Sequence, residues 1–329
     1  MDSPSLPPSS VSQLKRFDRE KPSAFESVLL VRRIAVKMAK NGSEYLSVEL
    51  ADKTGSFHAT CFGDSAAFQY FQDIPEGAVA RVQGVTGYYQ ERFSPKISEA
   101  EKCDPDTLPP TVLDQLVDKS LEDPDALWEE LQTHIQAIAN PQLRETVLNA
   151  LNELGDRFKF APGGIVMHHA YRAGLMEHTV HILRAAKAIL PFYAEVNSDL
   201  AVAGIILHDT GKAIEYEGQL SYRKSKEGLL HGHVVIGYRL TRKAGIKAGL
   251  APELLERLEH IILSHQGELE WGAAVLPATP EAVFVSMIDN LDAKMGMVQK
   301  ALQQTPETER FSDYLPGLRT KLLVTPLPS

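Results

Sequence analysis

The sequence predicts a multidomain protein of α and β structure, in which a small N-terminal β-barrel is followed by an all-α domain. Strand-like alternation over residues 28–98 and helical periodicity after a Pro- and Asp-rich stretch support this fold class. The length of 329 residues is sufficient for two ordinary domains. The expected boundaries are a disordered tail over 1–24, the barrel over 25–100, a linker over 101–111 and the helical domain over 112–329.

Composition excludes several classes of protein. Hydrophobic and charged contents of 43% and 23% are typical of soluble globular proteins, and no apolar run is long enough to cross a bilayer. The start, MDSPSLPPSSVSQ, lacks the basic and apolar regions of a secretory signal. Cys61 and Cys103 are too few for a disulfide framework, so a cytoplasmic location is expected. The net charge of −9 argues mildly against binding nucleic acid by bulk charge alone.

The front part of the chain contains five short segments rich in β-branched and aromatic residues: VLLVRRIAVKMA, EYLSVELAD, SFHATCFG, AVARVQGVTGYY and RFSPKIS. Five strands within about 70 residues fit a small closed barrel better than an open sheet. The aromatic residues that could stack on bases are Phe57, Phe62, Tyr88, Tyr89 and Phe93. Most of them would serve equally well in the core of the barrel. Tyr88 and Tyr89 are the best candidates, because adjacent residues of a strand face opposite sides.

The back part reads as helical throughout. LEDPDALWEELQTHIQAI opens with Asp and Pro, as helices often do, and continues with apolar residues at a period of 3.6. No later stretch shows convincing strand alternation, and the tail FSDYLPGLRTKLLVTPLPS stays unassigned. The sequence contains neither GxGxxG nor a P-loop, so chemistry that depends on NAD or ATP has no support.

An apolar helical run, LAVAGIIL, ends in LHDTGK, which places His208 beside Asp209. Imidazole and carboxylate are two ligand types for a divalent transition metal, although one such pair is weak evidence. The pair has companions in GLMEHTVHIL, HGHVVIG, LEHIILSHQGELEWG and VSMIDNLDAKM. A single histidine is more often a hydrogen-bonded core residue, but this ordered set favours a metal site.

The order of these motifs resembles the HD-domain superfamily of metal-dependent phosphohydrolases. More narrowly, HHAYRAGLMEHT, LHDTGK, GHVVIG, LSHQGELEWG and IDNLDAKM together are similar to the YhaM-type 3′→5′ exoribonucleases. Members of that family join an N-terminal OB-fold to a C-terminal HD domain. The similarity covers roughly residues 25–300.

The resemblance implies a set of metal ligands. One ion would be held by His178, His208, Asp209 and Asp289, and a second by His233 and His265, with Asp209 bridging the two. Mn²⁺ is the expected metal, as one or two ions, and Fe, Co and Zn are also acceptable to these ligands. The ions would activate a water and clamp the phosphate oxygens. Asp209 and Lys212 are the expected catalytic residues, with Lys212 offering a cation to phosphate; a solvated lysine at a helix end is the alternative.

Other residues near the motifs receive supporting roles. Arg172 is a candidate phosphate contact because its planar fork matches phosphate, and His169 would either touch substrate or orient a ligand. His260 and Asp292 are expected to support rather than to bind metal, and His233 is preferred to His231 as the ligand. Lys224 and Lys226 are expected at the mouth of the site. Gln266 departs from the family pattern, which often has a second histidine there.

The expected function is hydrolysis of single-stranded RNA from its 3′ end, with single-stranded DNA as an alternative substrate and no membrane partner. The OB-fold would hold the strand while the helical domain hydrolyses the terminal phosphodiester. Two alternatives stay open. One is an HD-domain phosphohydrolase that acts on mononucleotides or cyclic nucleotides. The other is a nucleic-acid-binding protein with a degenerate metal site, for which Gln266 is the supporting feature.

Overall fold

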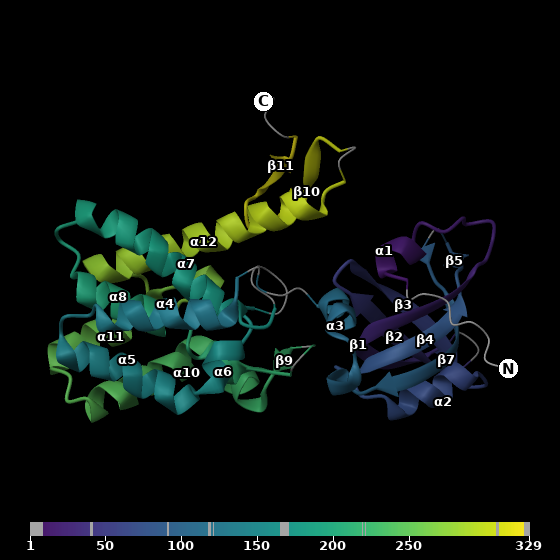
Figure 1. Cartoon of the computed structure of the whole chain (residues 1–329), viewed down its shortest axis with the longest axis horizontal. Helices are drawn as coiled ribbons and strands as arrows, with labels where there is room; N and C mark the ends of the chain where they lie inside the picture. Colours follow the sequence, from purple (N-terminus) through teal and green to yellow (C-terminus); the bar gives the residue numbers. More distant parts are fainter. Residues whose placement is uncertain are drawn as a thin grey trace. The chain divides into compact units, whose positions relative to one another are not determined.

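The computed structural model describes residues 9–39, 42–90, 92–117, 120, 122–164, 171–218, 220, 222–306 and 309–325. Two compact units divide the chain (Figure 1): residues 1–119 with Gly218–Tyr222 form one, and the remaining residues form the other. The first unit therefore extends through the segment expected to be a linker. We call these the barrel unit and the helical unit.

The barrel unit is built on one antiparallel sheet with the strand order β3-β2-β1-β4-β7. Its strands are β1 (Ala24–Met38), β2 (Glu44–Asp52), β3 (Gly55–Phe62), β4 (Val79–Val85) and β7 (Lys96–Cys103). The first half of β1 pairs with β4 and its second half pairs with β2. One long strand therefore joins both halves of the sheet, which curves around a shared core.

A register shift between Val31 and Arg33 marks the place where β1 changes partner. Such a bulge bends a strand and increases its twist, as a curled sheet requires. Among the described residues, the ladders join the five strands in one row, and none pairs β3 with β7. The expected strands are therefore present, but the described ladders do not close into a complete barrel.

Part of the N-terminal segment is ordered, unlike the expected disordered tail. The short helix α1 (Val11–Leu14) is capped by Ser10, and both of its terminal residues are buried in the core of the barrel unit. The Val11 N–H donates to Asp52 Oδ2 over 2.7 Å. Burial of these apolar side chains offsets the entropy of ordering this turn. The expectation of disorder is wrong for these residues.

The rest of the barrel unit consists of small connecting elements. Helix α2 (Ala66–Asp73) lies between β3 and β4, and its Phe71 is buried in the core. The short strands β5 (Tyr88–Tyr89) and β6 (Arg92–Phe93) pair with each other. A 3-10 turn over Pro105–Thr107 and helix α3 (Pro110–Leu116) complete the unit.

The helical unit surrounds one continuous apolar core. Capping residues begin several of its helices, for example Asp123, Asn140 and Asn197, whose side chains accept from backbone N–H groups of the first turn. The helices are α4 (Pro124–Gln136), α5 (Pro141–Leu154), α6 (Asp156–Phe160), α7 (Gly174–Ile189), α8 (Ser198–Leu207), α9 (Lys212–Glu215), α10 (Lys226–Lys247), α11 (Pro252–Ser264) and α12 (Pro280–Gln304).

The helical unit is not entirely α, which corrects the expectation of no strands after the barrel. Strands β8 (Tyr216–Glu217) and β9 (Arg223–Lys224) form a short hairpin, and β10 (Phe311–Leu315) pairs with β11 (Thr320–Leu323). Their alternation is too short to register as strand periodicity. Figure 1 shows the second of these hairpins at the end of α12. Within the described part of the chain, no helix has the length and apolar character of a membrane span.

Candidate active site and nucleic-acid interface

Several helices of the helical unit bring the expected metal ligands together. Helix α8 is apolar on all sides and ends inside the core, so the residues at its C-terminal end, His208 and Asp209, are 0% and 2% exposed. His178 lies in α7, His233 in α10 directly after a kink at Gly232, His265 directly after α11, and Asp289 in α12. The six expected ligands therefore meet at one buried place.

His178, His208 and Asp289 form a first cluster of possible ligand atoms, the first subsite. The Nε2 atoms of the two histidines are 3.3 Å apart. Asp289 Oδ1 lies 3.2 Å from His178 Nε2 and 3.9 Å from His208 Nε2. Asp209 Oδ2 faces the same atoms, at 3.6 Å from His178 Nε2 and 3.3 Å from His208 Nε2. Two imidazoles and two carboxylates thus converge on a space of cation size.

Asp209, His233 and His265 form a second cluster, the second subsite. Asp209 Oδ1 lies 3.5 Å from His233 Nε2 and 3.4 Å from His265 Nε2. This carboxylate oxygen is buried and has no hydrogen-bond donor among the described residues. An orphaned buried oxygen facing two imidazole nitrogens fits a cation. The two oxygens of Asp209 therefore face different subsites, as a bridging ligand requires.

The electrostatics of the site favour positive charge. Burial alone would lower the pKa of His178, but hydrogen bonds to Asp289 and Asp292 raise it to about 10. Burial opposes ionisation of Asp289, yet its hydrogen bond to His178 lowers the pKa to about 2. The pKa of Asp209 is held well below its usual range, against its burial, by Lys212 and His208. Both carboxylates of the cluster are therefore held in their ionised form, the form in which they can bind a cation.

Backbone carbonyls orient two of the histidines. His208 Nδ1 donates to the Ile205 carbonyl over 2.6 Å, and His265 Nδ1 donates to the Ile262 carbonyl over 2.8 Å. Both histidines directly follow a helix, where carbonyls of the last turn lack intrahelical partners. The proton is thereby fixed on Nδ1, and Nε2 is left as the ligand atom.

Carboxylates orient the other two histidines. His178 Nδ1 donates to Asp292 Oδ2 over 2.7 Å, and His233 Nδ1 donates to Glu215 Oε2 over 3.0 Å. Such contacts fix the ring and raise its basicity. Sequence reasoning gave Asp292 a supporting role but missed Glu215. The available signal was an acidic residue on the turn after LHDTGK, in LHDTGKAIE.

Two lysines contact carboxylates of the site, those of Asp209 and Glu215. Lys212 is nearly buried, and its Nζ donates to Asp209 Oδ2 over 2.6 Å, so it is paired with Asp209 rather than solvated. Lys224 Nζ lies 2.9 Å from Glu215 Oε1. Burial opposes ionisation of Glu215, but His233 and Lys224 lower its pKa to about 2. Each lysine therefore keeps a carboxylate of the site ionised.

The remaining residues expected at the site make other contacts, are exposed, or lie outside the described residues. The guanidinium of Arg172 lies 3.9 Å from the centre of the Phe160 ring. His260 Nε2 accepts from the Ala278 N–H over 2.8 Å, and the side chain of His231 is exposed. His169 lies outside the described residues.

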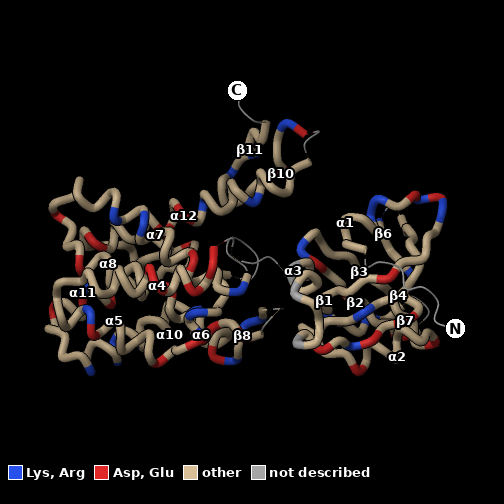
Figure 2. The backbone as a smooth tube through the Cα atoms, in the orientation of Figure 1, with Lys and Arg blue, Asp and Glu red and all other residues tan. Residues whose placement is uncertain are grey.

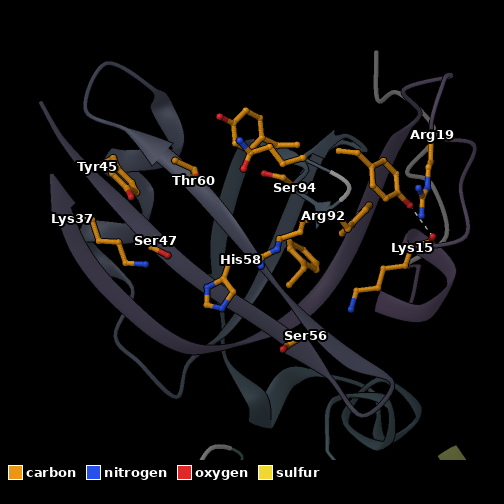
Figure 3. A pocket seen from close by; sticks show the side chains of 15 residues that line it. Lys15, Arg19, Lys37, Tyr45, Ser47, Ser56, His58, Thr60, Arg92 and Ser94 are labelled. Atoms are coloured by element: carbon orange, nitrogen blue, oxygen red, sulfur yellow. Dashed lines mark hydrogen bonds between the residues drawn. The ribbon is translucent and has the colours of Figure 1, made fainter. Parts of the chain in front are cut away.

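A groove of about 810 Å³ crosses one face of the barrel unit (Figure 3). Figure 3 shows Lys37 and Tyr45 toward one end, Lys15 and Arg19 toward the other, and His58 and Arg92 between them. The lining comes from β1, β2, β3, the β5–β6 hairpin and the segment around α1. Both cationic and aromatic side chains line it, which suits a single strand of nucleic acid.

Four of the five aromatic candidates line the groove or lie in the core, whereas Phe62 is exposed and lies outside both. Tyr89 is 67% exposed and lines the groove. Tyr88 also lines it, but its hydroxyl donates to the Lys15 carbonyl over 2.8 Å and its ring packs edge-on against Phe93. Phe57 is buried in the core, although its edge reaches the groove. Among the aromatic side chains of the groove, Tyr89 therefore offers the most exposed ring for stacking on a base.

Basic residues gather at this groove although the chain is acidic. Lys15, Arg19, Lys37 and Arg92 all line it, whereas no acidic residue does among the described residues. Figure 2 shows blue segments beside α1 and β6 in this unit. The net charge of −9 therefore gives no indication of this locally basic groove.

Comparisons with known proteins agree with this architecture. Residues 29–102 match the model of an OB-fold nucleic acid binding domain, and residues 175–294 match the model of the HD domain. The chain is therefore an OB-fold protein with a C-terminal HD domain, and it carries the ligand clusters described above.

Two curated relatives define the family. The 3′-5′ exoribonuclease YhaM of Geobacillus sp. strain WCH70 is 32% identical over 300 residues, which cover 91% of each chain. The 3′-5′ exoribonuclease YhaM of Halalkalibacterium halodurans is 30% identical over 312 residues, 92% of this chain and 93% of the relative. The chain belongs to the YhaM family.

Proposed function

We propose that this protein is a metal-dependent 3′→5′ exoribonuclease that hydrolyses single-stranded RNA. The observation that carries the proposal is the pair of buried ligand clusters that share Asp209. The activity named for both relatives and the nucleic-acid-binding domain support it. Single-stranded DNA is a second substrate compatible with a groove that binds by stacking and charge.

The residues have separable roles in this proposal. His178, His208 and Asp289 hold one ion, His233 and His265 hold the other, and Asp209 lies between them. Divalent ions held there, of which Mn²⁺ is the one we propose, would supply an activated water and neutralise phosphate oxygens. Asp292 and Glu215 keep their histidine partners in the orientation that exposes Nε2.

Lys212 acts first on Asp209, whose carboxylate it keeps ionised. An ammonium group has three N–H donors, so the same group can also donate to a phosphate oxygen. Arg172 is the second proposed phosphate contact, because its guanidinium is exposed on the ring of Phe160. His169 stays a proposed substrate residue.

The test compares a strand that has a free 3′ end with two substrates that have none. A linear single-stranded RNA, the same sequence closed into a circle, and a cyclic mononucleotide are each incubated with the protein and Mn²⁺. The linear strand should be degraded, and the other two should survive. Asp209→Asn should abolish the reaction, whereas Asp64→Asn, on an exposed turn of the barrel unit, should not. Cleavage of the circle at the same rate, or preferred hydrolysis of the cyclic mononucleotide, would contradict the proposal.

A further inference from the structure

The side chain of Gln266 lies against the second subsite. Its amide nitrogen is 3.0 Å from His265 Nε2 and 3.2 Å from His233 Nε2. These are the same two nitrogen atoms that, with Asp209 Oδ1, would hold the second ion. The amide therefore contacts both ligand nitrogens at once.

The hydrogen-bond pattern dictates which end of the amide faces the histidines. His265 Nδ1 donates to a carbonyl and His233 Nδ1 donates to a carboxylate, so each neutral ring presents a bare lone pair at Nε2. An amide oxygen there would be repelled by both lone pairs. The NH₂ group has two hydrogens, one for each of these acceptors. Gln266 thus satisfies both nitrogens in the absence of a cation.

We propose that Gln266 holds the second subsite closed, so that a second cation binds only by displacing its amide. The inference rests on the proposed function of the cluster as a metal site. In the first subsite, the Nε2 atoms of His178 and His208 lie against each other and against carboxylate oxygens of Asp209 and Asp289. Binding at the second subsite therefore includes a step of its own, the displacement of the Gln266 amide from two ligand nitrogens.

The free energy of displacing the Gln266 amide determines how much the affinity for the second ion is reduced. A cation must break two neutral hydrogen bonds before it gains both nitrogens. Two such bonds correspond to roughly tenfold or more in affinity. The amide therefore weakens binding of the second ion, and hydrolysis that needs both ions would depend on the free metal concentration.

The experiment measures Mn²⁺ binding to the metal-stripped full-length protein, by calorimetry and by the electron paramagnetic resonance signal of free Mn²⁺. Gln266→Met keeps the length of the side chain but removes both donors. Gln266→Glu replaces the donors by acceptors. Gln303→Met and Gln303→Glu, at an exposed position of α12, make the same changes away from the site.

The inference predicts that the wild-type protein binds the second ion roughly tenfold or more weakly than Gln266→Met does. Both Gln266 variants should tighten the second ion and leave the first unchanged, and both Gln303 variants should bind as the wild type does. An unchanged or weakened second ion in Gln266→Met would overturn it. A protein that binds no Mn²⁺ at either subsite would overturn the proposed function as well, so the two failures are distinguishable.

Discussion

Four histidines of the site differ in what holds their rings. Backbone carbonyls hold His208 and His265, and no side-chain substitution can remove those acceptors. Asp292 and Glu215 hold the other two rings, and each can be tested by mutation. The structure thus separates ligands fixed by the fold from ligands fixed by a single side chain.

Asp292→Ala should weaken metal binding about 10–100-fold, because His178 loses the carboxylate that orients its ring. Titration of the metal-stripped protein with Mn²⁺ measures this effect directly. Asp313→Ala, on an exposed position of β10, serves as the control. A purely structural role predicts a lower melting temperature with unchanged metal affinity, and that result would refute the positioning role.

Tyr89→Ala should weaken binding of single-stranded RNA by about 1–3 kcal/mol, the usual contribution of one stacked base. Tyr89 is the most exposed aromatic residue in the groove. Tyr70→Ala removes an exposed tyrosine of the same unit outside this groove and should bind RNA as the wild type does. Fluorescence anisotropy with a catalytically silent Asp209→Asn background gives both affinities. Equal losses in the two variants would mean that the groove is not the binding surface.

At the scale of elements, the close approach of α9 to α10 positions His233. A Cβ atom on Gly211 would overlap the His233 carbonyl and lie 2.7 Å from the Gly237 nitrogen. Gly211→Ala should therefore displace α10, cost about 1–3 kcal/mol of stability and weaken the second subsite. On the facing helix, a Cβ on Gly237 would meet its nearest atom at 3.4 Å, so Gly237→Ala should be tolerated. Urea unfolding of both variants measures the two losses of stability. Equal losses would contradict the predicted difference between Gly211→Ala and Gly237→Ala.

Arg184, in α7, contacts Glu130 in α4 and Glu122 in the segment directly before α4. Its guanidinium donates to both oxygens of Glu122 and both of Glu130. The hydrogen bond to Arg184 is the largest cause that lowers the pKa of Glu122, to about 2 from its usual 4.5. Because the folded-state pKa is depressed, this contact stabilises the fold above about pH 4.5 and stops doing so as the pH falls toward 2.

The stability lost in Glu122→Gln should therefore be larger at pH 6 than at pH 3.5. Urea unfolding at both pH values measures the difference in each protein. Glu129→Gln, an exposed position on α4, should show no such dependence. A stability difference that is constant across this range would show that the contact does not act through the ionised carboxylate.

Long elements were predictable from the sequence, and short ones were not. The apolar run of α8 ends in adjacent ligand residues, so His208 and Asp209 could be located from sequence. The hairpins β8–β9 and β10–β11 are too short to show alternation. Helix α1 is a single turn whose order depends on contacts with distant parts of the sheet, such as that with Asp52. Glu215 was missed for a similar reason, because its contact with His233 is tertiary.

At the scale of the whole molecule, charge is divided between a basic groove and an acidic site. Lys15, Arg19, Lys37 and Arg92 line the groove, while carboxylates gather at the ligand clusters of the helical unit. Net charge alone therefore says little about the substrate. In the proposed function, the carboxylates of the clusters bind metal, and the lysines and arginines of the groove attract phosphates.

RNA affinity should consequently fall as salt rises, despite the net charge of −9. Removal of one cation that contacts phosphate, as in Arg92→Gln, should reduce the slope of log affinity against log salt by about 0.7. Arg239→Gln, on an exposed face of α10, should leave the slope unchanged. The anisotropy titration repeated over a salt series provides the slopes. A slope that is the same in all three proteins would exclude Arg92 from the interface.

Metal-dependent degradation from the 3′ end is tested with one RNA labelled at its 5′ end and the same RNA labelled at its 3′ end. With Mn²⁺, the 5′ label should appear in a ladder that shortens with time, while the 3′ label should be released as small products from the first time points. Asp209→Asn and chelation of the metal should each prevent both changes. Early release of the 5′ label, or cleavage that survives Asp209→Asn, would contradict the account.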